Sequence, residues 1–334
     1  MKALVTGGGG FLGRAIVELL VSRGDRVRVL ARNRYPDVEA LGAECVQGDI
    51  RSEPDCVGAC MGMDAVFHAA ALPGIWGDRK LFHAINVQGT RHIIDACKRR
   101  GVPKLIFTSS PSVVFDMKDE CGINEDTPYP QRFYNIYSQT KAHAESIVLE
   151  NSGRDGLQAC ALRPHLIWGP RDNHLLPRLI ERALKKKLRI VGRGENKVDL
   201  TYVENAAAAH LLASDAMTPK RVAGQAYFIS DGQPVELWPW INEFLKRVSV
   251  EPAKKRAPVA LAYAAGFCFE NLFWLIRRRK EPPMTRFLSK ALSCSHYYDI
   301  SKARRDFGYR PIVSNDEGLR RTAEYFKKNV PKEK

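Results

Sequence analysis

Residues 2–13, KALVTGGGGFLG, decide the fold of this 334-residue chain. The apolar run 2–6 leads directly into four glycines, and a helical pattern over 11–23 precedes a second apolar run, 27–30. A strand, a glycine turn, a helix and a second strand within 30 residues predict a βαβ unit. In the spacing Gly7-x-x-Gly10-x-x-Gly13, the missing side chains let the backbone approach a diphosphate, and the helix N-terminus offers it unpaired N–H groups. We therefore expect a dinucleotide site here; the alternative is a purely structural glycine turn.

The alternation of strands and helices continues along the first half of the chain. Further apolar runs at 44–46, 64–68, 104–108 and 157–162 are separated by helical segments. This pattern predicts an α/β fold with a doubly wound parallel sheet. After residue 164 the sequence becomes helical and rich in proline. We expect 1–163 to form the dinucleotide-binding domain, to which 199–230 returns, and 164–198 with 231–334 to form a smaller, mostly helical substrate-binding domain.

Composition narrows the class of protein. Apolar residues make up 45% and charged residues 27%, which excludes a disordered chain, a collagen-like fibre and a disulfide scaffold. The first residues lack the ~7–15 apolar residues of a signal peptide, and eight scattered cysteines favour a reducing compartment. We therefore expect a cytoplasmic protein. Cys56 and Cys60 have no second pair of ligands, so no metal site is expected.

The chain is strongly basic, with 52 Lys and Arg against 37 Asp and Glu, a formal charge of +15. The basic runs 185–189 and 277–280 are not interleaved with aromatic residues, and no helix-turn-helix or zinc-finger spacing occurs. We therefore expect no nucleic-acid partner. The charge is consistent with an anionic membrane surface, with docking of a pathway enzyme, or with steering of an anionic ligand.

The residues after the second strand bear on the choice of dinucleotide. An NAD site has an Asp or Glu about 20 residues beyond the glycines, whereas residues 29–34 read VLARNR. Arg32 and Arg34 suit a 2′-phosphate, because guanidinium pairs with phosphate through two hydrogen bonds. The sequence thus favours NADP(H), with NAD(H) possible and a solvated basic loop as the alternative. Asp49 could accept a hydrogen bond from the adenine amino group, or cap a helix.

Tyr137 and Lys141 are four residues apart and share one face of a predicted helix. A tyrosine has a reference pKa near 10, and a nearby cation lowers it toward the range useful in acid–base catalysis. Ser110 follows a predicted strand at the sheet edge where ligands bind, so its hydroxyl could hold a substrate carbonyl. Asn86 could organise a water relay to Lys141, or could equally hold a helix kink.

These motifs resemble those of a known family. The extended short-chain dehydrogenase/reductases are similar at TGGGGFLG (6–13), HAAA (68–71), NVQGT (86–90), TSS (108–110) and YSQTK (137–141). Segments 163–164, 167–170, 194–205 and 224–229 resemble the 3β-hydroxysteroid dehydrogenase branch. Segments 111–113, 163–172 and 281–288 are most similar to the bacterial 2-alkyl-3-oxoalkanoate reductases, and the sterol-4α-carboxylate 3-dehydrogenases are similar as well.

The resemblance implies a Rossmann-type fold and a role for each motif. Tyr137 would be the general acid/base, Lys141 would lower its pKa and hold the nicotinamide ribose, and Ser110 would bind the reacting oxygen, with Asn86 completing the catalytic set. Trp168 and Tyr202 would join Ser110 in binding substrate. The residues expected to bind the cofactor are Gly7, Gly10, Phe11, Leu12, Gly13, Arg32, Arg34, Asp49, Ile50, Ala69, Ala70, Tyr137, Lys141 and Pro164. Many members carry an acid after the second strand, so the resemblance does not imply NAD.

The function implied is an NADP(H)-dependent oxidoreductase that interconverts 3-oxo and 3-hydroxy groups on a lipophilic substrate. A 2-alkyl-3-oxoalkanoic acid is the first expectation, and a 3β-hydroxysteroid or sterol-4α-carboxylate is the second. A nucleotide-sugar epimerase or dehydratase, and a non-catalytic NADP(H) sensor or assembly subunit, stay open as well. The family habit implies a homodimer.

Residues 258–276, PVALAYAAGFCFENLFWLI, form a 19-residue apolar stretch with basic flanks. A membrane-spanning helix needs ~20 apolar residues, but Glu270 and Asn271 are costly in lipid. We expect a buried helix that lines the substrate pocket. The alternative is an interfacial helix lying on anionic lipid, which would make the protein peripheral to the membrane.

Overall fold

The first βαβ unit of the computed structural model, which describes residues 1–329, has the predicted order. Strand β1 (Lys2–Thr6) leads through the glycines to helix α1 (Phe11–Ser22), which is followed by strand β2 (Arg26–Ala31). The two strands pair in parallel, with Thr6 opposite Leu30. From its second residue onward β1 is buried, as expected for a strand covered on both faces.

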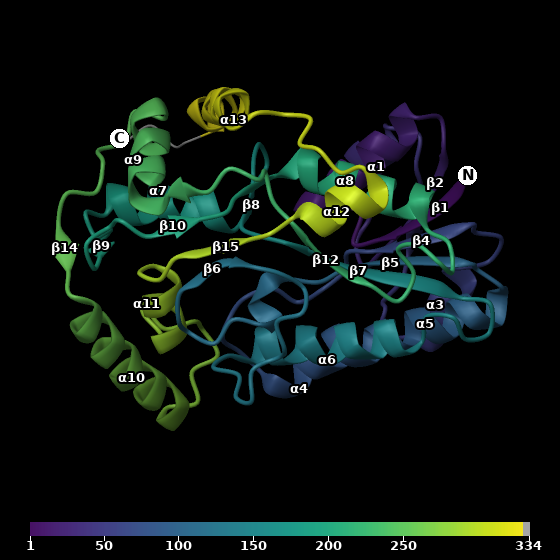
Figure 1. The fold of residues 1–334 in the computed structure, drawn as a ribbon, viewed down its shortest axis with the longest axis horizontal. Coiled ribbons are helices and arrows are strands. Elements are labelled where there is room, and N and C mark those ends of the chain that lie inside the picture. Colours follow the sequence, from purple (N-terminus) through teal and green to yellow (C-terminus); the bar gives the residue numbers. More distant parts are fainter. Residues whose placement is uncertain (330–334) are drawn as a thin grey trace.

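The described residues form a parallel sheet of seven strands, with the spatial order β12-β7-β5-β4-β1-β2-β3 (Figure 1). Its other strands are β3 (Glu44–Gln47), β4 (Ala65–His68), β5 (Lys104–Thr108), β7 (Gln158–Pro164) and β12 (Ala226–Ile229). All the carboxyl ends therefore lie at one edge. The strand order reverses between β1 and β4, and ligands of open α/β sheets bind in the crevice at such a reversal.

Helices cover both faces of this sheet, as Figure 1 shows. Helix α1 packs with α8 (Val203–Ala216) and α12 (Ser301–Phe307) in one apolar cluster. On the opposite face, α3 (Glu53–Ala59), α5 (Gly89–Arg100) and α6 (Ile136–Glu150) form a second cluster. Short helices α2 (Pro36–Glu39) and α4 (Arg79–His83) lie in the connections. The doubly wound α/β fold predicted from the sequence is confirmed.

A third apolar cluster lies beyond the sheet and centres on the buried rings of Trp168, Trp238, Trp240 and Phe244. The helices of this part are α7 (Leu175–Leu184), α9 (Leu237–Arg247), α10 (Val259–Leu275), α11 (Arg286–Ala291) and α13 (Asn315–Asn329). The short strands are β6 (Glu120–Ile123), β8 (Ile167–Trp168), β9 (Ile190–Val191), β10 (Lys197–Val198), β11 (Thr201–Tyr202), β13 (Val235–Glu236), β14 (Arg256–Ala257) and β15 (His296–Tyr298).

The short strands pair across the boundary expected at residue 163. They pair as β13-β10-β15-β6, β11-β8 and β14-β9. Strand β6 belongs to the first expected domain by sequence, yet it pairs in parallel with β15 near the end of the chain. This pairing joins the two parts above the sheet edge. Residues 330–334 of the expected second domain lie outside the described residues.

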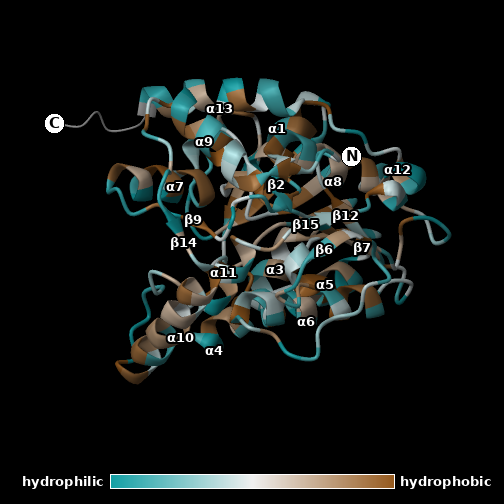
Figure 2. Ribbon diagram, turned by 60° about the vertical axis from the view of Figure 1, so that its left-hand side comes forward, coloured by the Kyte–Doolittle hydropathy of each residue, from teal (hydrophilic) through white to brown (hydrophobic). Residues whose placement is uncertain are grey.

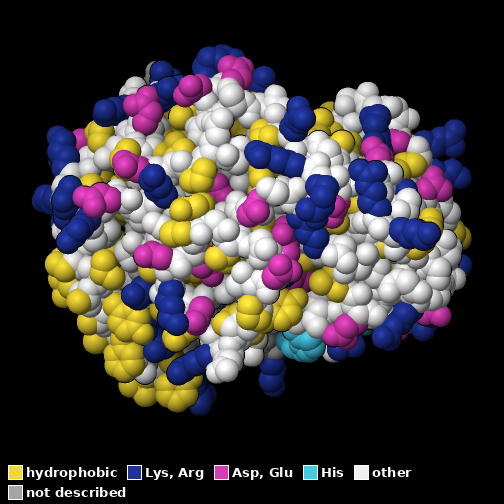
Figure 3. Space-filling view, in the orientation of Figure 1, with side chains coloured by type: hydrophobic (Ala, Val, Ile, Leu, Met, Phe, Trp, Pro, Cys, Tyr) yellow, Lys and Arg dark blue, Asp and Glu magenta, His cyan; other side chains and the backbone are white. Residues whose placement is uncertain are grey.

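Helix α10 projects from the rest of the molecule (Figure 2), and apolar side chains gather on the surface in this region (Figure 3). The expectation of a buried helix is wrong: Trp274 is 76% exposed, and only Ala262, Gly266 and Phe273 are buried. The helix packs against α11, and a Cβ on Gly266 would clash with the backbone at Thr285. Within residues 1–329, no helix has both the length and the apolarity that crossing a bilayer requires.

Candidate active site

Three adjoining cavities lie at the carboxyl edge of the sheet. The turn cavity, of about 250 Å³, contains Gly7, Gly10 and Arg32. The central cavity, of about 380 Å³, shares both glycines with it. The apolar cavity, of about 370 Å³, shares Ser110 and Tyr137 with the central one. Tyr137 therefore lies where a groove along the glycine turn meets an apolar cavity.

The glycine turn forms a cradle that side chains would fill. Gly7 has a φ of +71°, and a Cβ on it would lie 2.9 Å from the Cα of Ala70. A Cβ on Gly13 would overlap the carbonyl of Gly7. Helix α1 begins just after Gly10, which provides no side-chain cap, so its first N–H groups are left for a ligand. The residues present thus fit a dinucleotide pyrophosphate.

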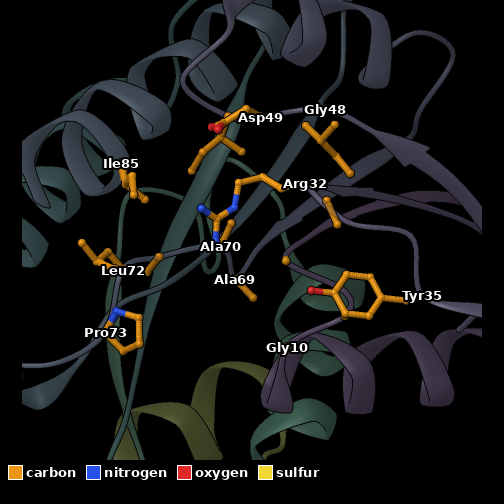
Figure 4. A pocket seen from close by; sticks show the side chains of 16 residues that line it. Gly10, Arg32, Tyr35, Gly48, Asp49, Ala69, Ala70, Leu72, Pro73 and Ile85 are labelled. Carbon is orange, nitrogen blue, oxygen red and sulfur yellow. The ribbon is translucent and has the colours of Figure 1, made fainter. Parts of the chain in front are cut away.

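The two arginines after β2 have different surroundings. Figure 4 shows the guanidinium of Arg32 pointing into the turn cavity beside Asp49 and Ala70. Arg34 does not line this cavity: it is largely exposed and pairs with Glu39 at 3.2 Å. Arg34, which was also expected to bind cofactor, thus lies outside this cavity and is paired with an acid on α2.

Asp49 and Tyr35 complete the wall around Arg32 (Figure 4). Arg51 binds the Asp49 carboxylate at 2.6 Å and holds its pKa below the usual range, so Asp49 stays an acceptor. Sequence reasoning missed Tyr35, whose ring lies so close to Gly9 that a Cβ there would overlap it. The only signal in the sequence for a role of Tyr35 was its position, as an aromatic residue four positions after the end of β2.

The remaining predicted cofactor residues line the turn or central cavity. In the turn cavity these are Ile50, Ala69 and Ala70, and in the central cavity Phe11, Leu12, Gly13, Ala69, Tyr137, Lys141 and Pro164.

Tyr137 and Lys141 are placed by the first turns of α6. Asn135 caps this helix by accepting a hydrogen bond from the Ser138 amide at 2.7 Å. The Lys141 ammonium donates to the Thr108 carbonyl at the end of β5 and lies 3.9 Å from the centre of the Phe107 ring. Helix α6 thus brings the tyrosine and lysine to the end of β5, where Ser110 follows.

The pKa values of this pair depend mainly on burial. Burial raises the pKa of Tyr137 to about 12, which a hydrogen bond with Ser110 partly offsets. Burial lowers the pKa of Lys141 to about 7, and the negative charge of Glu145 opposes this. The expected lowering of the Tyr137 pKa is not observed, because burial outweighs the effect of the Ser110 hydrogen bond and Lys141 makes no resolved contribution. Tyr137 therefore keeps its proton at neutral pH and can act as an acid.

Asn86 lies in a π-helical turn, η1 (Ala84–Gln88), and its amide is fully used. Its Oδ1 accepts from the Leu72 amide at 2.7 Å, while its Nδ2 donates to the Leu72 carbonyl and to Thr140. The alternative of a helix irregularity is thus the one observed. Asn86 fixes the loop after β4 to α6, and within residues 1–329 its side chain forms no hydrogen bond with Lys141.

The apolar cavity is lined mainly by hydrocarbon. Leucines from α7, α9 and α11 form much of its wall, together with Trp240 and Ile241. Besides Ser110 and Tyr137, its polar side chains include Ser112, His165, His296 and Tyr298. Sequence reasoning missed the two histidines. Helix α10, expected to line this cavity, contributes no residue to its wall.

Trp168 and Tyr202, expected to bind substrate, line neither the central nor the apolar cavity. Both are completely buried, and their rings contact each other edge to face at 5.3 Å. The expectation was wrong because β8 and β11 pair in parallel and turn these two side chains into the third apolar cluster.

Comparison with known proteins adds independent information. A model of the 3-beta hydroxysteroid dehydrogenase/isomerase family matches residues 4–259. A 2-alkyl-3-oxoalkanoate reductase from Shewanella oneidensis is 46% identical over 96% of this chain and 84% of its own length. The same-named protein of Stenotrophomonas maltophilia is 45% identical over 96% and 98%. The mouse sterol-4-alpha-carboxylate 3-dehydrogenase, decarboxylating, is 36% identical over 97% and 91%.

Solved structures share the same architecture. The crystal structure of gox2253 superimposes with a TM-score of 0.78 and 25% identity, covering 98% of both chains. UDP-glucuronic acid 4-epimerase from Bacillus cereus, in complex with NAD, gives a TM-score of 0.73 and 23% identity over 98% of this chain and 99% of that one. At such identities the likeness concerns the fold.

Proposed function

Because the chain belongs to the 3-beta hydroxysteroid dehydrogenase/isomerase family of extended short-chain dehydrogenase/reductases, we propose that it interconverts the 3-oxo and 3-hydroxy groups of a 2-alkyl-3-oxoalkanoic acid with NADP(H). The protein is a nicotinamide-dependent oxidoreductase. The observation that carries the proposal is the position of Tyr137, between a groove that fits a dinucleotide and a cavity walled by leucine side chains. Relatives that span nearly the whole chain bear the corresponding name.

The cofactor would be held by the turn and central cavities. The glycine cradle and the first N–H groups of α1 suit its pyrophosphate, and Lys141 lies in the central cavity beside Tyr137. When bound, the reduced nicotinamide supplies the hydride that is added to the 3-oxo carbon. Arg32 supports NADP(H), because its guanidinium points into the turn cavity, where it could bind a 2′-phosphate.

In the reductive direction, Ser110 and Tyr137 would both bind the 3-oxo oxygen. As negative charge develops on this oxygen, the phenol of Tyr137 donates its proton and the product alcohol forms. The high pKa of Tyr137 keeps the phenol protonated before the reaction, and phenolate forms only when the oxygen takes its proton. Lys141 has a pKa of about 7, so it can hold a proton close to Tyr137.

The lining of the apolar cavity favours lipophilic substrates over nucleotide sugars. The hydroxyls and phosphates of a nucleotide sugar would face leucines and Trp240, which offer no hydrogen bonds inside the cavity. A sterol carboxylate is the second candidate, supported by relatives of that name at 36% identity. Its rings would use the same walls, and its 3-hydroxyl the same Ser110 and Tyr137.

Absorbance of the reduced nicotinamide tests the proposal directly. The wild-type protein is incubated with NADP+ and a 2-alkyl-3-hydroxyalkanoic acid, or with a 3β-hydroxysteroid in parallel. We expect turnover of the hydroxy acid and a loss of about 100-fold or more in Tyr137→Phe. Tyr297→Phe is the matched control, since Tyr297 alternates with the cavity-facing residues of β15. Turnover of the steroid alone, or full activity of Tyr137→Phe, would contradict the assignment.

We also propose that α10 lies on an anionic lipid surface. Its last turn exposes Trp274, Leu275 and Ile276, and residues 277–280, all Arg or Lys, follow directly. Figure 3 shows this apolar surface with basic side chains beside it. A helix that combines exposed apolar side chains with flanking basic residues is typical of the membrane interface. The substrate proposed for the enzyme would be dissolved in such a surface.

A further inference from the structure

The apolar cavity contains a pair of histidines that have no role in the proton transfer proposed for Tyr137. His165 follows the end of β7, and His296 begins β15. The Nε2 of His165 lies 2.7 Å from the Nδ1 of His296, and both rings line the cavity that contains Ser110 and Tyr137. We propose that this pair binds the carboxylate of the substrate, with His165 as the residue that contacts it. The inference rests on the function proposed above.

The carboxylate of the proposed substrate needs a polar partner inside the cavity. A 3-oxo acid carries its carboxylate two carbons away from the oxo group, so both groups must enter the same part of the cavity. Among the described residues that line it, there is no Lys or Arg. A carboxylate buried among leucines without a partner would cost several kcal/mol. Ser110 and Tyr137 are committed to the oxo group, so another donor is required.

The remaining polar groups of the wall already have partners. The Tyr298 hydroxyl donates to Glu120 at 3.0 Å, and the Trp240 indole donates to Asn315 at 3.0 Å. Ser112 is hydrogen-bonded to Ser110. Within residues 1–329 no hydrogen bond is formed by the Nδ1 of His165, although that residue lines the cavity.

The hydrogen bonds within the histidine pair have a defined direction. The Nε2 of His296 lies 2.9 Å from the Ala291 carbonyl, which can only accept, so this nitrogen carries a proton. In the neutral ring its Nδ1 is then bare and accepts from the Nε2–H of His165. The Nδ1 of His165 is consequently the free acceptor of the pair. One added proton turns it into an N–H donor on a cation, which is the partner that a carboxylate needs.

The charges around the pair are compatible with this proton uptake. Burial lowers the pKa values of both histidines, so the pair is neutral before the substrate enters. A carboxylate beside His165 favours the imidazolium and therefore binds together with a proton. The titratable groups close to the pair are Tyr137 and Tyr298 in the same wall, Glu120 and Asp199, which are hydrogen-bonded to Tyr298, and Asp119, whose charge acts on His296. Glu120 has a pKa raised by burial to about 7, and its ionisation would also favour the cation.

The test compares an acid with its neutral counterpart. The substrates are a 2-alkyl-3-hydroxyalkanoic acid and its methyl ester, and the variants are His165→Gln and His296→Gln. We expect the KM of the acid to rise about 10- to 100-fold in His165→Gln, the effect of losing one hydrogen bond to a charged group, while the ester is unaffected. In the wild type, we expect the KM of the acid to rise by up to about tenfold per pH unit, and the KM of the ester to stay constant.

Controls separate this inference from the proposed function. His83→Gln changes an exposed histidine on α4 and should leave both substrates unaffected. Glu120→Gln removes the nearby carboxyl group whose pKa burial raises to about 7, and the pH dependence of the acid should persist. Equal effects of His165→Gln on acid and ester, or a pH-independent KM for the acid, would overturn the histidine proposal alone. A wild type that converts neither compound would overturn the proposed function.

A binding measurement keeps the inference testable in that case. Calorimetry with a 2-alkylalkanoic acid, which lacks the 3-oxygen, and with its primary amide requires no turnover. We expect the acid to bind more tightly than the amide and to take up a proton, seen as a heat that differs between buffers, and we expect His165→Gln to abolish both properties. Equal binding of acid and amide to the wild type would refute the carboxylate site.

Discussion

Arg32 and Arg34 are two residues apart, but only one of them has a charge available to a ligand. Arg32 points into the turn cavity, whereas Arg34 pairs with Glu39 on α2. Replacing Arg32 with Ala should raise the KM for NADPH about 10- to 100-fold, since one hydrogen bond between charged groups is lost. The KM for NADH should stay nearly constant. Arg34→Ala is the matched control, and an equal effect of both variants would show that the loop only attracts anions.

The buried side chain of Lys141, which is placed for its role in the site, should lower the free energy of unfolding of the protein. Its pKa of about 7 lies below that of an exposed lysine, near 10.4, so between these pH values the unfolded chain binds more protons. The contribution of Lys141 to the free energy of unfolding therefore becomes more favourable as pH rises from about 7 to about 10. Lys141→Met should unfold at higher urea concentration than the wild type near pH 7, with a difference that shrinks toward pH 10. A variant less stable at every pH would contradict this.

At the scale of secondary-structure elements, a buried ion pair connects α6 to β7. Glu145 lies one turn after Lys141, and Arg163 binds it at 2.6 Å with both side chains almost fully buried. Tyr129 donates to the same carboxylate. Arg163→Met leaves Glu145 buried without its cation, and we expect a loss of about 3–5 kcal/mol in the free energy of unfolding, measured with urea.

A second substitution tests the origin of that loss. Glu145→Leu added to Arg163→Met removes the orphaned charge, so the double variant should be more stable than Arg163→Met alone. A double variant that loses the sum of both single effects would show that packing, and not charge, dominates at this contact.

The elements that the sequence predicted correctly have local signals. The glycine turn, β1 and α1 are specified by neighbouring residues, and so are Tyr137 and Lys141 on α6. The His165–His296 pair joins residues 131 positions apart, so no spacing could indicate it. Within the segment 199–230, Thr201 and Tyr202 pair with β8 before α8 begins at Val203, and no local pattern indicates this pairing. The exposed face of α10 was also unpredictable, since Glu270 and Asn271 are the only polar interruptions of its apolar stretch and define no clear polar face.

At the scale of the whole molecule, α10 sets an apolar surface beside a strong positive charge. The double variant Trp274→Glu with Leu275→Glu should bind vesicles rich in phosphatidylglycerol at least about tenfold more weakly than the wild type in a sedimentation assay. Ile312→Glu is the matched control, since Ile312 is a 60% exposed apolar residue outside α10. High salt should weaken wild-type binding, because basic residues contribute to it. Equal binding of the double variant and the wild type would refute the lipid proposal.

The loop between β4 and α4 connects that surface with the reaction centre. Its Leu72 is fixed by Asn86, Pro73 borders all three cavities, and the Trp76 indole donates to the Arg278 carbonyl just beyond α10. An enzyme bound through α10 would then collect its substrate from a two-dimensional film. Its rate would follow the mole fraction of substrate within the lipid, so adding inert lipid would slow the reaction even though the amount of substrate per volume of suspension stayed the same.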